Sequence, residues 1–251
     1  MQADRHHRIL DYLQNNHSAD VEELSKLCSV SPATIRRDLN YLHKNGEVER
    51  VRGGGFLKET HNDNLVLPRA SMHYEEKKRI GKQAADLVKN GETIIISTGS
   101  TTEAMVPYLA EKSDLTVITN ALNVAYRLTR YENISVIVLG GLLRHREFDL
   151  LGHITENSLT NLVATKLFRG VRGIHHKQGL TASDIMQVRT DEKMIQKVRE
   201  LIIVADHSKF SFMGSAHLGP VTTASTIITD TEAPMDEVER IRNLGVKVIM
   251  V

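Results

Sequence analysis

Two spacings of apolar residues follow one another along this chain. Up to about residue 58, apolar positions recur every three or four residues, which is the pattern of short amphipathic helices. Beyond about residue 75, runs of β-branched residues alternate with helical patterns. The segment between them is polar, irregular and interrupted by Pro68, which is typical of a connecting segment. These changes predict a first domain at residues 1–58, a linker at residues 59–74 and a second domain at residues 75–251.

The first domain is predicted to contain three short helices. The first covers residues 5–15 and carries an apolar stripe. Asp20 and Glu23 have the spacing of a capping box, which predicts that a second helix begins there. Ser31 is a favourable N-cap for the third helix, and Pro32 suits its first position.

The third helix is predicted to end before Gly46 and to present polar side chains outside the core. Its apolar residues stand at positions i, i+4 and i+7, so they face inward. The polar side chains on its other faces belong to Thr34, Arg36, Arg37 and Asn40.

A basic hairpin is predicted after this helix, where the extended stretch EVERVR runs into three glycines that allow the chain to turn back. The whole chain has a net charge of only +1, so a nucleic-acid signal must be local. Residues 31–58 supply it, because they hold six Lys and Arg side chains against three Asp and Glu, a local charge of +3. A helix with Arg and Asn on its free face fits the major groove, and a basic glycine loop can approach phosphates.

We therefore predict a winged helix-turn-helix that binds double-stranded DNA. A helical bundle with a solvated basic face is the alternative. The expected DNA-binding residues are Ser31, Thr34, Arg36, Arg37, Asn40, Arg50, Arg52, Gly53 and Gly54.

The second domain is predicted to be an α/β domain with a mostly parallel sheet, because apolar strands alternate with helices that would cover both of its faces. The predicted strands lie at residues 93–97, 115–119, 134–140, 201–206, 225–230 and 246–251. Ligands of such sheets bind at the carboxyl ends of the strands, so the residues that follow each strand are the candidate site.

The first of these loops, STGSTT at residues 97–102, combines hydroxyl groups, a glycine and the start of a helix, which together can bind a phosphate group. The loop lacks the Gly-Lys-Ser/Thr of a Walker motif and the three-glycine dinucleotide spacing, so neither ATP nor NAD is expected, and no cofactor is predicted. The same residue types also serve as ordinary turns and helix caps, which is the alternative interpretation.

Two sets of segments carry a resemblance to a known family. The stretch SVSPATIRRDLNYLHKNGEVERVRGGG closely resembles the DNA-binding region of the DeoR family of bacterial transcriptional repressors. The segments EKKRIGKQAADLV, STGSTTEA, ITNALNVA, LGGLLR, GLT and DHSKF follow the order found in the effector domain of that family. The resemblance implies operator DNA as partner, a Rossmann-like effector domain similar to ribose-5-phosphate isomerase and coenzyme A transferase folds, and a phosphorylated sugar or related metabolite as ligand.

Carried over to this chain, the resemblance places the phosphate on Gly99, Ser100 and Thr101. The full set of expected effector-binding residues is Ser97, Thr98, Gly99, Ser100, Thr101, Asn120, Gly141, Asp206 and Lys209.

The chain departs from the family pattern at several positions. Ser97 stands where the family often has Asp, and Arg169 and Arg172 replace apolar or small residues. The two arginines are expected either to contact an anion or to serve a subunit interface. Pro107 follows the phosphate loop closely enough to interrupt the next helix or delay its start.

Other residue types narrow the function classes. The single cysteine, Cys28, excludes an internal disulfide and is expected in the core. The N-terminus does not read as a signal peptide and no apolar stretch is long enough to span a membrane, so a cytoplasmic protein is expected. The chain has twelve histidines, and no metal site is predicted, because adjacent pairs such as His175 and His176 are not expected to converge on one ion.

The leading hypothesis is a repressor of a carbohydrate-utilisation operon that works as a homo-oligomer, a dimer or a tetramer. A sugar-phosphate isomerase is the second hypothesis, because an isomerase needs a carboxylate base near the reacting carbon. The candidate bases are Asp149, Asp184, Glu192 and Asp206. A scaffold with a vestigial pocket is the third hypothesis, which the intact glycine and hydroxyl loop disfavours.

Overall fold

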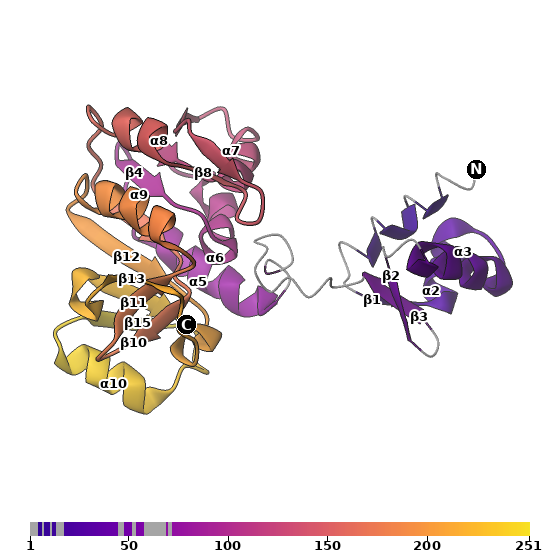
Figure 1. Ribbon diagram of the computed structural model, residues 1–251. Coiled ribbons are helices and arrows are strands. Elements are labelled where there is room, and N and C mark those ends of the chain that lie inside the picture. Colours follow the sequence, from indigo (N-terminus) through magenta and orange to yellow (C-terminus); the bar gives the residue numbers. More distant parts are fainter. Residues whose placement is uncertain are drawn as a thin grey trace. The chain divides into compact units, whose positions relative to one another are not determined.

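The computed structural model (Figure 1) describes residues 5–6, 8–10, 12–13, 18–44, 48–51, 54–57, 69 and 72–251. The chain divides into two compact units, Met1–Asp63 and Asn64–Val251, each with its own apolar core. No helix among these residues is both long enough and apolar enough to cross a membrane.

The N-terminal unit is a helix-turn-helix with a small antiparallel sheet. The described residues between Arg5 and Leu13 are helical, as predicted. The other helices are α2 (Val21–Cys28) and α3 (Pro32–Lys44), and the strands are β1 (Ser18–Asp20), β2 (Val48–Val51) and β3 (Gly54–Leu57), in the order β1-β3-β2. The pairing of β2 with β3 confirms the predicted hairpin, whereas β1 was not predicted because only three residues form it.

Local capping fixes the helix boundaries in this unit. The Asp20 carboxylate accepts hydrogen bonds from the backbone N–H groups of Glu22 (2.8 Å) and Glu23 (2.7 Å), and the Glu23 side chain accepts from the Asp20 N–H. The predicted capping box is therefore confirmed. Cys28 is buried in the core as predicted, and burial raises the pKa of its thiol.

The C-terminal unit is built on a seven-stranded sheet in which all neighbouring strands are parallel. Its order is β15 (Lys247–Met250), β14 (Thr226–Thr229), β12 (Glu200–Val204), β9 (Lys166–Arg169), β4 (Thr93–Ile96), β5 (Leu115–Thr119) and β6 (Ile134–Val138). The predicted parallel α/β domain is confirmed, and six of these strands coincide with predicted ones. The strand β9 was missed, because it is short and has a charged residue at each end.

Helices and short helical turns cover both faces of this sheet. Residues of α5 (Tyr74–Asp86), the 3₁₀ turn η1 (Val106–Leu109) and α7 (Leu122–Leu128) pack on one face. Residues of α9 (Ile185–Ile195) and α10 (Met235–Asn243) pack on the other. The remaining elements are α6 (Ser100–Glu103), α8 (His153–Ser158), η2 (His207–Phe210), η3 (Val221–Thr223), the hairpin β7 (Leu142–Arg144) with β8 (Asp149–Leu151), and the sheet β10 (Gly173–His175), β11 (Gly179–Ala182) and β13 (Ala216–Gly219).

Two features of this topology position the site. From β4 the chain adds β5 and β6 on one side of the sheet and then adds β9, β12, β14 and β15 on the other, so the order in which strands are added reverses between β4 and β9. Ligands of open α/β sheets bind at this kind of switch point. The helix after β4 is interrupted as predicted, because α6 stops at Glu103 and a separate turn follows that contains Pro107.

Candidate effector site and DNA interface

The outer face of α3 carries the side chains expected to read DNA. Arg36, Arg37 and Asn40 are exposed, and Thr34 is half-buried. Ser31 caps the helix by accepting a hydrogen bond from the Thr34 N–H at 3.3 Å. Gly54 begins β3, and Arg50 lies in β2 with a side chain outside the described atoms. Arg52 and Gly53 lie outside the described residues.

Asp38 is a buried residue of α3 that sequence reasoning did not single out. Its carboxylate forms an ion pair with Arg5 Nε at 2.6 Å and contacts His6 Nε2 at 3.0 Å. Burial works to raise the pKa of Asp38, but the hydrogen bonds from Arg5 and His6 outweigh it and hold that pKa below its ordinary value. The pairing ties the first helical segment to α3 and leaves the neighbouring arginines directed outward.

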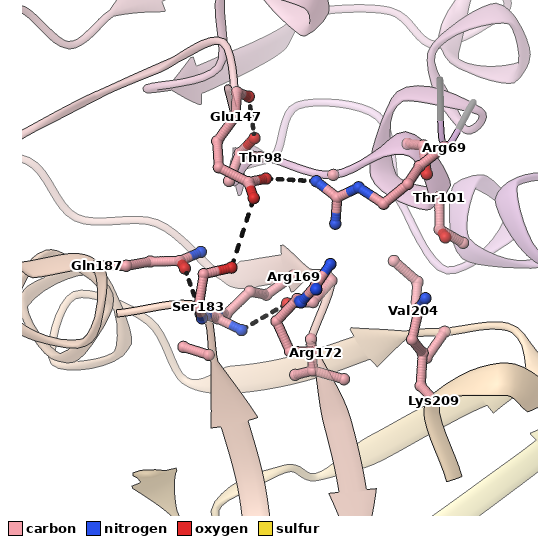
Figure 2. Close-up of a pocket in the computed structure, with 16 residues that line it drawn as sticks. Arg69, Thr98, Thr101, Glu147, Arg169, Arg172, Ser183, Gln187, Val204 and Lys209 are labelled. Atoms are coloured by element: carbon pink, nitrogen blue, oxygen red, sulfur yellow. Dashed lines mark hydrogen bonds and ion pairs between the residues drawn. The ribbon is translucent and has the colours of Figure 1, made fainter. Parts of the chain in front are cut away.

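A cavity lies at the switch point, where the loops after β4, β9 and β12 meet (Figure 2). Five of the nine predicted effector residues line it: Thr98, Gly99, Ser100, Thr101 and Lys209. The other lining residues are Arg69, Glu147, Arg169, Gly170, Val171, Arg172, Ala182, Ser183, Gln187, Val204 and Ala205.

Four predicted effector residues lie outside this lining. Asn120 donates from Nδ2 to the Leu150 carbonyl at 3.0 Å, so it fastens the β7–β8 hairpin. Gly141 allows close packing, because a Cβ there would lie 2.1 Å from Thr155 Oγ1. Asp206 caps the turn that carries Lys209, and Ser97 is buried at the end of β4.

The phosphate loop has a special backbone but only a short helix after it. Gly99 has a φ of +153°, a conformation that favours glycine, and a Cβ there would lie 3.1 Å from Thr102 Oγ1. The helix α6 is only four residues long, so its macrodipole contributes less than the sequence interpretation assumed. Side chains must therefore supply most of the positive charge of the cavity.

Two arginines supply part of that charge: Arg169 is the last residue of β9, and Arg172 follows the strand. Arg169 is completely buried, forms an ion pair with Asp191 and donates to the Gly170 carbonyl. Its burial excludes a subunit interface for this side chain. Among the described atoms, Arg169 Nε is buried and has no hydrogen-bond partner. Arg172 lies over the ring of Phe212, 5.0 Å from its centroid, and borders the cavity.

Glu147 is the acidic group of the cavity, and no motif pointed to it. It lies in the turn between β7 and β8, where its carboxylate is paired with Arg69 and accepts from Ser183 Oγ at 3.4 Å. Its backbone carbonyl accepts a hydrogen bond from Thr98 Oγ1 at 3.0 Å. Figure 2 shows the Arg69 guanidinium directed at this carboxylate across the cavity.

Lys77 lies on α5 next to residues of the site, and it is 3% exposed. Its Nζ donates to the carbonyl groups of Arg69 and Met72 and lies 3.8 Å from Asp206 Oδ2. Burial lowers the pKa of Lys77 to about 8, although Asp206 works to raise it. Burial would by itself raise the pKa of Asp206, but Lys209, Ser208 and Lys77 outweigh it and keep that pKa below its ordinary value.

The lowered pKa of Lys77 predicts a specific pH dependence of stability. Between pH 8 and 10.5 the unfolded chain binds this proton and the folded chain does not, so the free energy of unfolding rises with pH across this window. Across this pH window the free energy of unfolding of the wild type is expected to rise by up to about 3 kcal/mol more than that of a Lys77→Met variant. Urea unfolding at pH values from 7.5 to 10.5 measures the difference. Lys82→Met, which changes an exposed residue of the same helix, is the control. Its free energy of unfolding is expected to change with pH as that of the wild type does.

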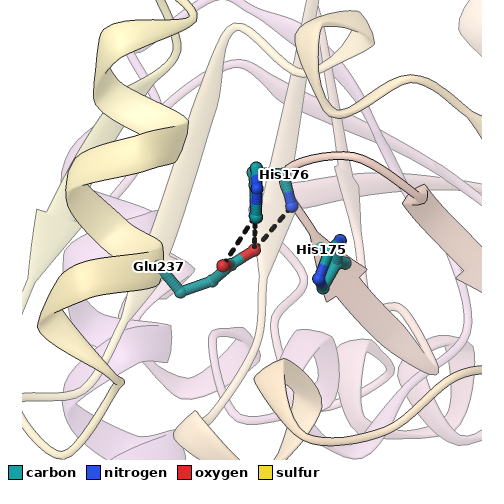
Figure 3. A group of neighbouring side chains, drawn as sticks. All are labelled: His175, His176 and Glu237. Atoms are coloured by element: carbon teal, nitrogen blue, oxygen red, sulfur yellow. Dashed lines mark hydrogen bonds and ion pairs between the residues drawn. The ribbon is translucent and has the colours of Figure 1, made fainter.

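His175, His176 and Glu237 form a cluster at the end of β10 (Figure 3), and their ligand atoms lie within 4.8 Å of one another. The expectation that these adjacent histidines cannot converge was therefore wrong, because the strand ends there and the rings stack. His175 Nδ1 accepts hydrogen bonds from the Lys177 and Gln178 N–H groups, so this nitrogen is engaged by the turn that follows β10. His176 Nδ1 is bonded to the Glu237 carboxylate at 2.8 Å. These contacts indicate a structural link between β10 and α10.

A basic helix-turn-helix unit combined with an α/β unit that has a cationic cavity at its switch point defines the class of ligand-responsive transcription regulators. Two family models match the chain. The DeoR-like helix-turn-helix domain matches residues 5–60, and the DeoR C terminal sensor domain matches residues 72–231. The chain belongs to the DeoR family of transcription regulators, as the resemblance implied.

Known proteins similar to this chain agree with this membership. The glycerol-3-phosphate regulon repressor of Escherichia coli (strain K12) is 33% identical over 234 residues, which cover 93% of each chain. The HTH-type transcriptional regulator GolR of Listeria innocua is 32% identical, over 98% of this chain and 97% of that protein. Among solved structures, ribose 5-phosphate isomerase A from Methanocaldococcus jannaschii matches with a TM-score of 0.40 and 18% identity, over 55% of this chain and 54% of that one.

Proposed function

We propose that this protein represses a carbohydrate-utilisation operon in the cytoplasm and that a phosphorylated sugar or polyol releases it from operator DNA. The observation that carries the proposal is the concentration of cationic side chains around one cavity: Arg69, Arg169, Arg172 and Lys209. Arginine binds the oxygens of phosphate in a forked geometry, and lysine adds a point charge. The repressor of a glycerol-3-phosphate regulon is among the similar proteins, which supports a small phosphorylated ligand.

Hydroxyl groups complement these cations. Thr98, Ser100, Thr101 and Ser183 border the same cavity and can donate to or accept from the hydroxyls of a polyol. The backbone N–H groups of Ser100 and Thr101, at the start of α6, need partners outside that helix, so they are additional donors. A ligand that combines a phosphate with several hydroxyl groups matches this set of groups.

We propose that the site binds this ligand without converting it. None of the carboxylates considered as isomerase bases, Asp149, Asp184, Glu192 and Asp206, lines the cavity. The one carboxylate among the lining residues, Glu147, is held in an ion pair with Arg69. Asp149 is paired with Arg144, and Asp184 caps α9 by accepting from the Gln187 N–H. NMR in heavy water tests this part of the proposal, because an isomerase would exchange the proton on the carbon beside the carbonyl of the ligand. Catalysed exchange that disappears in an Asp206→Asn variant would favour the enzyme.

The ligand proposal predicts selective thermal stabilisation. Glycerol 3-phosphate, ribose 5-phosphate and fructose 6-phosphate are suitable probes, and their unphosphorylated counterparts are matched controls. A ligand present at 100 times its Kd adds about 2.7 kcal/mol of stability, which raises the Tm of a domain of this size by several degrees. At least one phosphorylated probe is expected to do so, and its control is not. Equal shifts with and without the phosphate, or no shift with any phosphorylated probe, would contradict the proposal.

We also propose a homo-oligomer of at least two chains, assembled through residues 75–251. One short recognition helix reads too few base pairs for a genomic site, and paired modules on symmetric half-sites solve this problem. Exposed apolar side chains around the edge strand β6 support an interface there: Tyr126, Val138, Leu142 and Ile154. Light scattering is expected to give at least the mass of a dimer, and a monomer at operator-binding concentrations would rule this assembly out.

A further inference from the structure

Arg69 lines the cavity although it precedes α5 and belongs to the segment that follows the N-terminal unit. Two contacts hold it in place. Its guanidinium is paired with Glu147, and its backbone carbonyl accepts a hydrogen bond from the buried Lys77. The side chains of Arg69 and Glu147 are only 12% and 9% exposed, so solvent screens their pairing weakly. A change at Glu147 therefore acts on Arg69 at close range.

The Glu147 carboxylate occupies a place suited to an anionic ligand. It contacts Arg69 and the Ser183 hydroxyl, and it borders the same cavity as Lys209 and Arg172. A phosphate group entering this cavity would be repelled by Glu147 and attracted by Arg69, since like charges oppose and opposite charges attract in a site of low dielectric constant. Ligand and carboxylate therefore compete for one guanidinium.

The cavity is also too small to hold a ligand unless a side chain that lines it moves. Its free volume is about 30 Å³, enough for about two water molecules, whereas ligand sites usually span hundreds of Å³. A neighbouring cavity of about 800 Å³ shares Glu147, Arg172 and Ser183 with the first. Glu147 therefore lies where the two cavities meet, and its side chain borders both of them.

We propose that Glu147 is a built-in counter-anion that a phosphate monoester displaces from Arg69, and that Arg69 thereby couples occupancy of the cavity to Lys77 and the start of α5. The inference rests on the proposed function, because it assigns the regulation of the same site. In the unliganded state Arg69 is held by Glu147 and Lys77. In the liganded state its guanidinium binds the phosphate, and the Arg69 carbonyl group shifts against Lys77.

Isothermal titration of the full-length protein with inorganic phosphate and with glycerol 3-phosphate tests the competition. Glu147→Gln removes the competing charge but keeps the shape of the side chain, and it is expected to tighten phosphate binding about tenfold. Arg69→Gln is expected to weaken it about tenfold. Glu92→Gln is the matched control, because it breaks a comparably buried ion pair with Lys166 that is not part of the cavity, and it is expected to leave phosphate affinity unchanged.

Hydrogen exchange measured by mass spectrometry tests the transmission. Ligand binding is expected to speed amide exchange in peptides covering residues 72–80 of the wild type and to leave it unchanged in Arg69→Gln. If the ion pair only stabilises the fold, Glu147→Gln lowers the Tm without tightening phosphate binding, and that result overturns the inference.

The outcomes also separate this inference from the proposed function. Wild-type binding of either probe with no gain in Glu147→Gln overturns the inference and leaves the proposed function standing. Absence of phosphate binding in the wild type still permits a decision, because the inference then requires binding to appear in Glu147→Gln. Absence of binding of both probes in both proteins overturns the inference and the phosphate-site assignment together.

Discussion

Specific operator binding is expected to fall at least about 30-fold when Arg36 and Arg37 are both replaced by alanine, while the fold persists. Each good base contact discriminates by roughly 1–3 kcal/mol, and every 1.4 kcal/mol is tenfold in affinity. Both side chains are exposed on α3, whereas Asp38 on its inner side is paired with Arg5. Removing the two arginines therefore takes away DNA contacts without opening the core. Fluorescence anisotropy on an operator selected from random DNA measures the loss.

A charge-matched control separates base reading from general electrostatics. Arg130 and Arg199 are exposed in the C-terminal unit, and replacing both with alanine removes the same net charge away from α3. This control is expected to keep most of its operator affinity. If the Arg36 and Arg37 variant folds and binds the operator like the wild type, α3 is not the recognition helix.

Loss of induction is the expected result of Lys209→Ala. Lys209 borders the cavity from η2, and removal of a charge-assisted hydrogen bond to phosphate costs about 1.5–3 kcal/mol, or roughly 10-fold to 100-fold in ligand affinity. The variant is expected to bind the operator normally and to stay bound at ligand concentrations that release the wild type. In a reporter strain it gives permanent repression.

Lys247→Ala provides the control for this experiment. It removes an exposed lysine at the start of β15, the opposite end of the parallel sheet from the site, and is expected to leave induction unchanged. Gly99→Val is a poorer test of the site. The φ of +153° at Gly99 makes any side chain there a source of backbone strain, so loss of response could reflect a distorted loop. Normal induction in the Lys209→Ala variant would remove this residue from the effector site.

Local signals made the N-terminal unit predictable. Asp20, Ser31 and Pro32 specify where helices begin through contacts within three residues, and the i, i+4, i+7 spacing specifies which face of α3 is buried. The alternation of apolar strands and helices likewise determined a parallel α/β unit. The helix starts depend on contacts within one element, and the α/β class depends on the order of elements along the chain. Both can therefore be predicted from the sequence alone.

Short polar strands were decided only by tertiary structure. The strand β9 is central in the sheet, yet its end residues Lys166 and Arg169 read as exposed ends of a loop. They can be buried because Glu92 and Asp191, far away in the sequence, neutralise them. A pattern of apolar residues cannot reveal a strand whose buried charges have partners elsewhere.

The candidate site likewise has a part that the sequence predicts and a part that only the tertiary structure reveals. The loop at residues 98–101 was predictable, because hydroxyls and a glycine directly after a buried strand form a local signal. Arg69 and Glu147 are 78 positions apart, and no local pattern distinguishes them from solvated charges. Asn120 and Gly141 lie outside the cavity lining, where Asn120 bonds to the Leu150 carbonyl and Gly141 packs against Thr155. The sequence by itself determined the family, both domain types and a loop of hydroxyls and glycine that lines the cavity, whereas only the chain's path in three dimensions decided which distant charges share that cavity.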